Sequence, residues 1–299
     1  MLVKDRGKSI RIRKLEVMQR RVIKLHPKYL TMEDELSGRL AGHFGEQSND
    51  YFLKPFRDFS VMHDLRLTAH ESYFQIDTLL LSPRYILNLE VKYIIGTLVF
   101  DHLHQVIRVK DDGSEEAFRN PIFQVKRQQS HLMEWMTKNR IPPTPVRSLV
   151  VMSNPRTIIK APPSNKDVLH YITHSPYLQE KIKMIDKKYT DEKLTKKEVT
   201  KLSKLLVRHH VPENPDLLKR YGIEEKVIKG VYCTECFYLP VVRRNKTWHC
   251  PRCSYKSKNL HLILLKILLY YTVLKLLTNS FATFFKFHQG MFPHVYYLR

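Results

Sequence analysis

Two apolar runs that follow each other closely, residues 74–81 and 85–92, constrain this chain more than any other feature of its sequence. Each run has the length of a buried strand, and a Ser-Pro-Arg turn at 82–84 separates them. Runs of this kind predict two neighbouring strands in the interior of a sheet. The few polar residues that interrupt them therefore lie in an apolar setting.

The polar residues near the ends of the two runs include Asp77, Glu90 and Lys92. Side chains alternate along a strand, so Glu90 and Lys92 share one face while Val91 points to the other. A carboxylate and an ammonium group at the end of an apolar strand cost free energy unless they are paired or used. We interpret Asp77, Glu90 and Lys92 as a divalent-metal site for phosphodiester hydrolysis. A plain ion pair at a strand end is the alternative.

The chain of 299 residues carries 51 Lys and Arg against 29 Asp and Glu, which gives a net charge of +22. A field of this sign attracts polyanions, so nucleic acid is the first expected partner, with an anionic membrane and the ribosome as rivals. The alternative is that the basic surface is simply exposed to solvent and binds no polyanion. No apolar segment follows the basic N-terminus, so the sequence predicts no secretory signal and a cytoplasmic protein.

The order of the expected elements predicts an α/β fold over residues 31–155. Strands are expected over 59–67, 74–81, 85–92 and 147–152, with a hairpin over 96–110. A helix that opens at Thr31 should bury Leu36, Leu40, Ala41 and Phe44. A second helix, over 120–139, should carry Val125, Gln129, Leu132 and Met136 on one face.

Basic segments flank this region on both sides. Residues 1–30 are expected to form a basic leader, and residues 156–229 a Lys-rich helical segment. Within the second segment, Thr195 and Glu198 match a capping box. The segment is either a DNA-facing arm or a solvated amphipathic linker. We expect a linker, because charge runs on helices are usually solvated faces.

The strongest single motif is a pair of Cys-x-x-Cys knuckles within residues 230–257, made by Cys233 with Cys236 and by Cys250 with Cys253. Four thiolates can surround one tetrahedral zinc ion, and the spacer between the knuckles is long enough for a β-hairpin. Neither pair opens a helix, as a redox dithiol would. With no cysteine left over, the pattern favours metal in a reducing compartment over disulfides. The sequence predicts a zinc ribbon with a structural ion.

Basic and aromatic residues are interleaved around the expected ribbon. Small basic ribbons with exposed aromatic side chains hold nucleic acid through phosphate contacts and stacking, so we expect this one to bind nucleic acid. A domain this small also needs some of its aromatic residues for its own core. The basic residues are Arg243, Arg244, Lys246, Arg252, Lys256 and Lys258, and the aromatic residues are Tyr232, Phe237, Tyr238, Trp248 and Tyr255.

Four short motifs follow one another along the chain: Gly45-Glu46, Gln-Ile-Asp at 75–77, Glu-Val-Lys at 90–92, and Asn-Pro at 120–121 followed by Gln124. Together the motifs resemble the nuclease-related domain (NERD) family, a branch of the PD-(D/E)xK nuclease superfamily. The resemblance covers residues 35–155 and the ribbon, since some bacterial members of the family carry a C-terminal zinc ribbon. It implies a restriction-endonuclease-like core, with a mixed central sheet flanked by helices.

The resemblance also implies roles for individual residues. Asp77 and Glu90, together with the carbonyl of Val91, would ligate Mg²⁺ or Mn²⁺, because hard ions prefer oxygen. Lys92 would hold and polarise the attacking water or neutralise charge on the phosphate. The implied reaction is hydrolysis of a DNA phosphodiester bond that leaves a 5′-phosphate.

Glu46 and Gln124 complete the implied catalytic set. Glu46 would orient a second ion or a metal-bound water, and Gln124 would steady the site or touch the DNA backbone. The leading hypothesis is thus an Mg²⁺-dependent nuclease, or a nuclease-like DNA-processing protein, whose zinc ribbon grips nucleic acid. The second hypothesis is a non-catalytic DNA- or RNA-binding adaptor that keeps the fold. Domains of this kind are often paired with a protein partner, such as a helicase, that chooses the substrate.

The tail, residues 258–299, has no assigned role. From Leu260 to Leu277 it is almost continuously apolar except for Lys266 and Lys275. Two lysines make so short a membrane span costly, so we expect a buried or partner-facing helix, with a tail-anchored membrane protein as the third hypothesis. A slipped reading frame is a further hypothesis for this tail.

Overall fold

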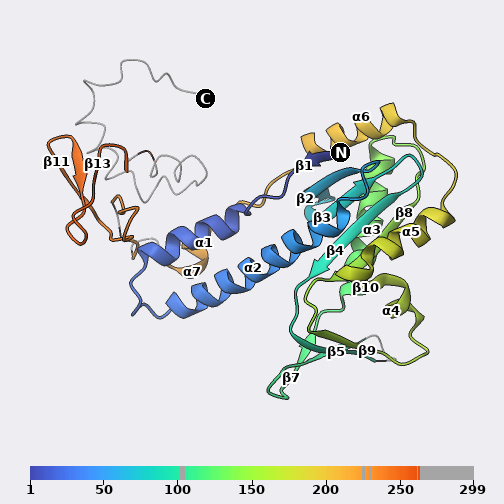
Figure 1. Cartoon of the computed structure of the whole chain (residues 1–299), viewed down its shortest axis with the longest axis horizontal. Helices are drawn as coiled ribbons and strands as arrows, with labels where there is room; N and C mark the ends of the chain where they lie inside the picture. The colour runs from blue at the N-terminus through green and yellow to red at the C-terminus, as the bar shows by residue number, and fades with distance from the viewer. Residues whose placement is uncertain (102–104, 224–225, 229, 261, 263–299) are drawn as a thin grey trace. The chain divides into compact units, whose positions relative to one another are not determined.

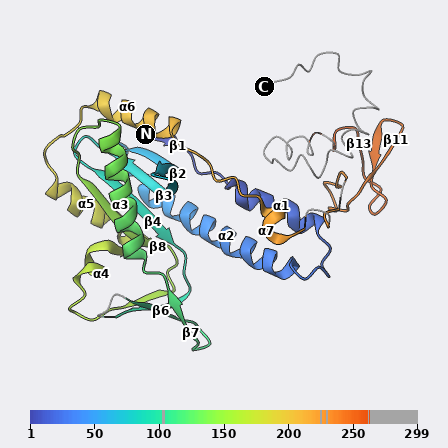
Figure 2. The same cartoon turned by 180° about the vertical axis from the view of Figure 1, so that it is seen from behind.

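The computed structural model describes residues 1–101, 105–223, 226–228, 230–260 and 262 (Figure 1, with the reverse view in Figure 2). These residues fall into two compact units. The first unit comprises residues 1–8 and 39–212, and the second comprises residues 9–38 and the described part of 213–299. The long helix α2 (Tyr29–Asp50) contributes residues to both units.

A six-stranded mixed sheet forms the centre of the first unit, in the order β1-β2-β3-β4-β8-β10. The strands β2, β3 and β4 pair antiparallel, whereas β1 with β2, β4 with β8 and β8 with β10 pair in parallel. The bounds are β1 (Leu2–Lys4), β2 (Ser60–Ala69), β3 (Ser72–Leu81), β4 (Ile86–Lys92), β8 (Val146–Met152) and β10 (Ile172–His174). The two apolar runs of the sequence are β3 and β4, at the middle of the sheet.

Helices cover both faces of this sheet. On one face α3 lies over the strands (Figure 2). Both α3 and α6 share a core with the strands on this face, through Leu132 and Leu206. On the other face α5 and η1 pack through Ile182 and Leu53. The bounds are η1 (Tyr51–Leu53), α3 (Pro121–Lys138), α4 (Lys166–Tyr171), η2 (Ser175–Tyr177), α5 (Leu178–Lys188) and α6 (Lys196–Arg208). The expected α/β class, with a mixed sheet flanked by helices, is confirmed.

A smaller sheet in the order β7-β6-β5-β9 extends the first unit. Its strands β5 and β6 form the expected hairpin over 96–110. Gly96 opens this hairpin at φ +104°, where an added Cβ would meet the Val109 carbonyl oxygen at 2.4 Å, so only glycine fits there. The bounds are β5 (Gly96–Phe100), β6 (Val106–Val109), β7 (Glu115–Phe118) and β9 (Thr157–Lys160).

The segment expected to be a linker supplies part of the core of the first unit. Helix α6 begins at the expected capping box, in which the Thr195 hydroxyl accepts from the Glu198 amide and the Glu198 carboxylate accepts from the Thr195 amide. Behind the cap, Val199, Leu202 and Leu206 are buried against the sheet. The first unit therefore continues to residue 212, well past the expected boundary at 155, because the sheet needs this apolar stripe to cover it.

The second unit holds α1 (Ile10–Arg21), the start of α2, α7 (Leu217–Tyr221) and a three-stranded sheet. Basic side chains of α1 are tied into this unit: Arg11 forms ion pairs with Glu35 at 2.7 Å and Glu213 at 3.1 Å. Much of the expected leader over 1–30 is therefore packed structure. The small sheet contains β11 (Val242–Arg244), β12 (Thr247–His249) and β13 (Lys256–Ser257).

Two expected buried faces differ from the structure in detail. On α2, Phe44 is 60% exposed, so its expected burial was wrong. The helix continues to Asp50, so Glu46 lies on it. On α3 it is Gln128, rather than Gln129, that is buried, because the rotation of the helix turns Gln128 toward β4.

Within the described residues, no helix combines the length and apolar character that a membrane crossing requires. Most of the apolar tail lies outside the described residues, and with it the expected helix over 260–277.

Candidate functional sites

Glu90 is the centre of a buried polar cluster on the face of β4 that meets α3. Its Oε1 accepts from Lys92 Nζ at 2.5 Å and from Gln124 Nε2 at 2.6 Å. Its Oε2 accepts from Gln128 Nε2 at 2.7 Å. Gln124 Oε1 in turn accepts from Lys92 Nζ at 3.0 Å, so the lysine is held from two sides. Three residues of the expected site, Glu90, Lys92 and Gln124, are thus in direct contact.

Gln128 also belongs to this cluster, although no sequence motif pointed to it. Besides Glu90, its amide contacts the carbonyl oxygen of Gln75 at 2.8 Å and receives a hydrogen bond from Asn88 Nδ2 at 3.0 Å. The signal was present in the sequence, because Gln124 and Gln128 are four residues apart and share one helical face. The partners of a buried amide side chain cannot be recognised from the sequence until the strand that faces it is known.

Asp77 lies where β3 and β4 separate. The pairing between these strands ends at Thr78 with Leu89, and the Asp77 Oδ2 atom accepts from the Val91 amide at 2.8 Å. The carboxylate thus replaces the strand partner that the Val91 amide lacks. In a ladder, the N–H and C=O of one residue point to the same neighbour, so the Val91 carbonyl also points toward the gap beside Asp77.

The chain departs from regular strand geometry at this same level. On β2, Met62 and Leu65 both face α3, although they are three residues apart and regular alternation would separate them by an even number. Ile76 and Leu79 on β3 show the same spacing, so the alternation of side chains shifts in both strands. Asp64, in the register position opposite Asp77, has φ +50°, a conformation that aspartate tolerates better than most residues. Irregular backbone of this kind re-aims side chains and often occurs beside active sites.

Burial and neighbouring charges shift the pKa values of Asp77 and Lys92. Burial raises the pKa of Asp77 well above its usual value, and the charges of Glu90 and Glu46 raise it further. Burial lowers the pKa of Lys92, but Glu90 and Asp77 more than offset that effect, so its pKa is raised and the ammonium stays charged. A divalent cation beside Asp77 would relieve the cost of ionising this buried carboxyl group. The oxygens of Asp77, Glu90 and Val91 also match the preference of Mg²⁺ and Mn²⁺.

Gly45 and Glu46 lie on α2, close to the end of β4. A side chain at position 45 would come within 2.6 Å of Tyr93 and Ser153, which follow β4 and β8, so glycine allows the helix to approach the strands closely. Glu46 thereby lies close enough to Asp77 and Glu90 for the charges of the three carboxylates to interact. Burial, opposed by Arg6, raises the pKa of Glu46 to about 7.

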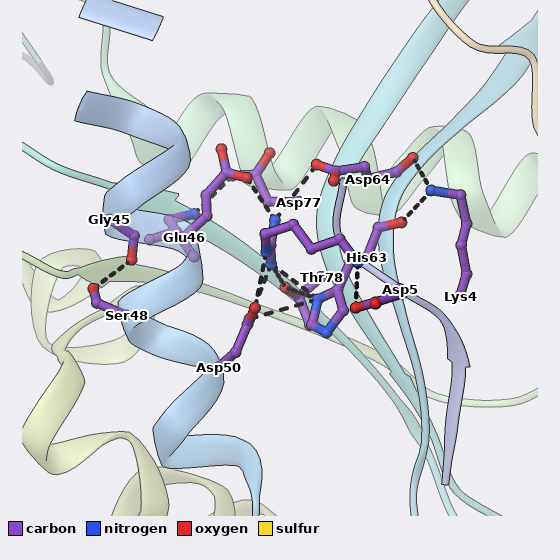
Figure 3. A network of polar contacts seen from close by, with 12 residues as sticks. Lys4, Asp5, Gly45, Glu46, Ser48, Asp50, His63, Asp64, Asp77 and Thr78 are labelled. Atoms are coloured by element: carbon purple, nitrogen blue, oxygen red, sulfur yellow. Dashed lines mark hydrogen bonds and ion pairs between the residues drawn. The ribbon is translucent and has the colours of Figure 1, made fainter. Parts of the chain in front are cut away.

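Arg6 pairs with Glu46 and was not anticipated from the sequence. Its Nη1 atom lies 2.5 Å from Glu46 and 3.4 Å from Asp64, and its Nε and Nη2 atoms hold both oxygens of Asp50 at 3.0 and 3.1 Å. Nη2 also donates to Thr78 Oγ1 at 2.8 Å. Figure 3 shows Glu46 and Asp50 projecting from α2 toward Asp64, Asp77 and Thr78 on the strands.

The four cysteines of the ribbon come together as expected. Their sulfur atoms all lie within 4.8 Å of one another. Among the described residues, these four cysteines form a group of side chains placed closely enough to hold a metal ion. Both knuckles share one geometry, since the amides of Phe237 and Ser254 donate to the carbonyls of Cys233 and Cys250 at 3.0 Å. A four-thiolate cage of this kind fits structural Zn²⁺.

The aromatic residues of the ribbon divide between core and surface. Trp248 is buried with Val231, Val241, Cys233 and Cys250, and the Arg243 guanidinium lies 5.4 Å from its ring centroid. Phe237 is exposed, and its ring stacks with Tyr232. The core role of one aromatic and the exposure of another both follow the expectation from the sequence.

The comparison with protein families agrees with the geometry. The family model described as "Nuclease-related domain" matches residues 41–153. This chain contains a nuclease-related domain. The matched segment runs from α2 to the end of β8, so the nuclease-related domain includes Glu46, Asp77, Glu90, Lys92 and Gln124.

No curated protein matches the sequence. A crystal structure of protein VC1899 from Vibrio cholerae aligns with 55% of this chain at 7% identity and a TM-score of 0.27. The aligned part covers 36% of the Vibrio chain.

Proposed function

We propose that this protein is a Mg²⁺- or Mn²⁺-dependent nuclease that hydrolyses phosphodiester bonds of DNA. The observation that carries the proposal is the placement of Asp77, Glu90 and Lys92 at the point where β3 and β4 separate, with Lys92 held by Glu90 and Gln124. The nuclease-related domain supports the same reading. A buried carboxyl group with a raised pKa, as at Asp77, beside a fixed lysine is typical of catalytic sites.

The carboxylates of Asp77 and Glu90 and the carbonyl of Val91 would hold the divalent ion. When bound, the ion would supply a Lewis acid and lower the pKa of a coordinated water. The protein residues have separate tasks around it. Lys92 orients the attacking water or offsets charge on the phosphate, and Gln124 fixes the direction of the lysine. Glu46 orients water bound in the site.

The zinc ribbon would grip the nucleic acid rather than cut it. Its four thiolates close the zinc site, and exposed Phe237 together with the basic side chains around the ribbon suit phosphate contacts and stacking. The net charge of +22 favours the same partner. Free thiols arranged for zinc suit a reducing compartment, so we place the protein in the cytoplasm, with a protein partner such as a helicase selecting the substrate.

The test is cleavage of labelled single- and double-stranded DNA with Mg²⁺, with Mn²⁺ and without divalent ion. Asp77→Ala and Lys92→Ala should abolish cleavage and leave the fold intact. Lys126→Ala is the matched control, since Lys126 also forms a lysine–carboxylate ion pair on α3, with Asp167 at 2.7 Å, but outside the cluster. A fully active Lys92→Ala protein would contradict the assigned roles. Salt-sensitive DNA binding with no cutting in any variant would favour the adaptor instead.

A further inference from the structure

The first eight residues of the chain are anchored to the sheet of the first unit. Strand β1 pairs in parallel with β2, and the N-terminal ammonium donates to the Arg57 carbonyl at 3.1 Å. Lys4 Nζ donates to the carbonyl oxygens of His63 and Asp64 at 2.7 and 3.1 Å. This anchoring delivers the next basic residue, Arg6, to the side of the candidate nuclease site.

The Arg6 guanidinium is enclosed by protein and fully used. Its side chain is 2% exposed, and all three of its nitrogens make hydrogen bonds. The carboxylates that it contacts come from two elements, Glu46 and Asp50 from α2 and Asp64 from β2. A guanidinium keeps its charge at any relevant pH and holds planar carboxylates in a fixed geometry, which a mobile lysine cannot do.

Arg6 already occupies the carboxylates that a second divalent ion would need. Its nitrogens lie 2.5 Å from Glu46, 3.4 Å from Asp64 and 3.0 and 3.1 Å from the two oxygens of Asp50. Asp77 and Glu90 instead contact the Val91 amide and Lys92, so these two carboxylates remain for one divalent ion. The neighbouring imidazole of His63 adds no charge, because burial and then Arg6 lower its pKa to about 4.

We propose that Arg6 is a built-in second cation of the nuclease site, which fixes Glu46 beside Asp77 so that the site binds one divalent ion and not two. The inference rests on the proposed nuclease function. Arg6 is a positioning residue in this scheme, since it acts through Glu46. Its removal would free Glu46, Asp50 and Asp64 together, and three carboxylates from facing elements would then accept a second ion.

The experiment counts bound Mn²⁺ on the full-length, zinc-loaded protein at pH 8, by electron paramagnetic resonance of the free ion. The wild-type protein should bind one Mn²⁺ that is lost in Asp77→Asn. Arg6→Gln should bind two, and adding Asp64→Asn to that variant should return the count to one. Arg6→Lys, which retains a positive charge, should stay at one while its kcat for DNA cleavage falls about 10-fold or more, as for other positioning residues around metal sites.

Each outcome decides one of the two ideas. Two Mn²⁺ ions in the wild-type protein, which needs no variant to fold, would overturn the role of Arg6 and leave the nuclease proposal standing. One ion in a folded Arg6→Gln protein would overturn it as well. No Mn²⁺ bound by the wild-type protein would instead contradict the metal site on which the inference rests.

Discussion

Glu46 offers the sharpest test of the electrostatics of the site. Its pKa of about 7 in the folded protein compares with 4.5 for an ordinary glutamate. The folded state therefore binds a proton more tightly than the unfolded state. The stability that this proton contributes is fully present below pH 4.5 and is lost as the pH rises through 7. At about 1.4 kcal/mol per pKa unit, the total loss is about 3 kcal/mol.

The neutral variant Glu46→Gln should escape this loss in buffer without divalent ions. We expect its free energy of unfolding to exceed that of the wild-type protein by up to about 3 kcal/mol at pH 8, and by less than about 1 kcal/mol at pH 5. The substitution does not leave Arg6 unpaired, because both oxygens of Asp50 continue to hold the guanidinium. Saturating Mg²⁺ should shrink the difference, since the ion would take over the neutralising role.

The assay is urea unfolding followed by tryptophan fluorescence. The chain has two tryptophans, Trp135 in the first unit and Trp248 in the second, so a Trp248→Phe background reports the first unit alone. Glu198→Gln is the control of opposite sign, because hydrogen bonds from Thr195 lower the pKa of Glu198, and this variant should lose stability at pH 8. A Glu46→Gln protein that is less stable than the wild type at pH 8 would refute the reasoning.

Other predictions concern the supporting residues. Gln128→Leu removes the donor to the second oxygen of Glu90 and should lower DNA cleavage about 10- to 100-fold, whereas Gln129→Leu should cleave normally. Leu206→Ala, at a fully buried position of α6, should cost the first unit about 2–5 kcal/mol of unfolding free energy in the same urea assay; an effect below about 0.5 kcal/mol would mean that α6 does not cover the sheet. Cys236→Ser should weaken zinc binding, measured by chromophoric chelator competition, and leave the urea midpoint of the first unit unchanged.

Much of the fold was predictable because local sequence carried it. The runs at 74–81 and 85–92 appear as β3 and β4, with their bounds shifted by two residues or fewer. The capping box at Thr195 and the helix over 120–139 were equally local signals. Expectations failed where a contact between distant segments decides the outcome. The burial of Gln128 rather than Gln129 depends on the rotation of α3 against β4, and no local pattern reports that rotation.

The domain boundaries show the same division. A Lys-rich helix reads as a solvated linker, and only the open apolar face of the sheet explains why Val199, Leu202 and Leu206 are buried against it. The leader likewise reads as a free basic segment, although Arg6 and Arg11 both lie in ion pairs with acidic residues far away in the sequence. A run of basic residues predicts a solvated surface, and only the tertiary structure shows which acidic residues pair with it.

The sequence by itself determined the chemistry that is available: two carboxylates and a lysine at the ends of apolar strands, and four cysteines at zinc spacing. These signals are local, since strand alternation and knuckle spacing depend on neighbouring residues only. The tertiary structure decided how that chemistry is held. It placed Gln128 under Glu90, separated β3 from β4 beside Asp77, and brought Arg6 to Glu46 across forty residues of chain. Such contacts depend on packing between remote elements, which a buried charge requires and a linear pattern does not encode.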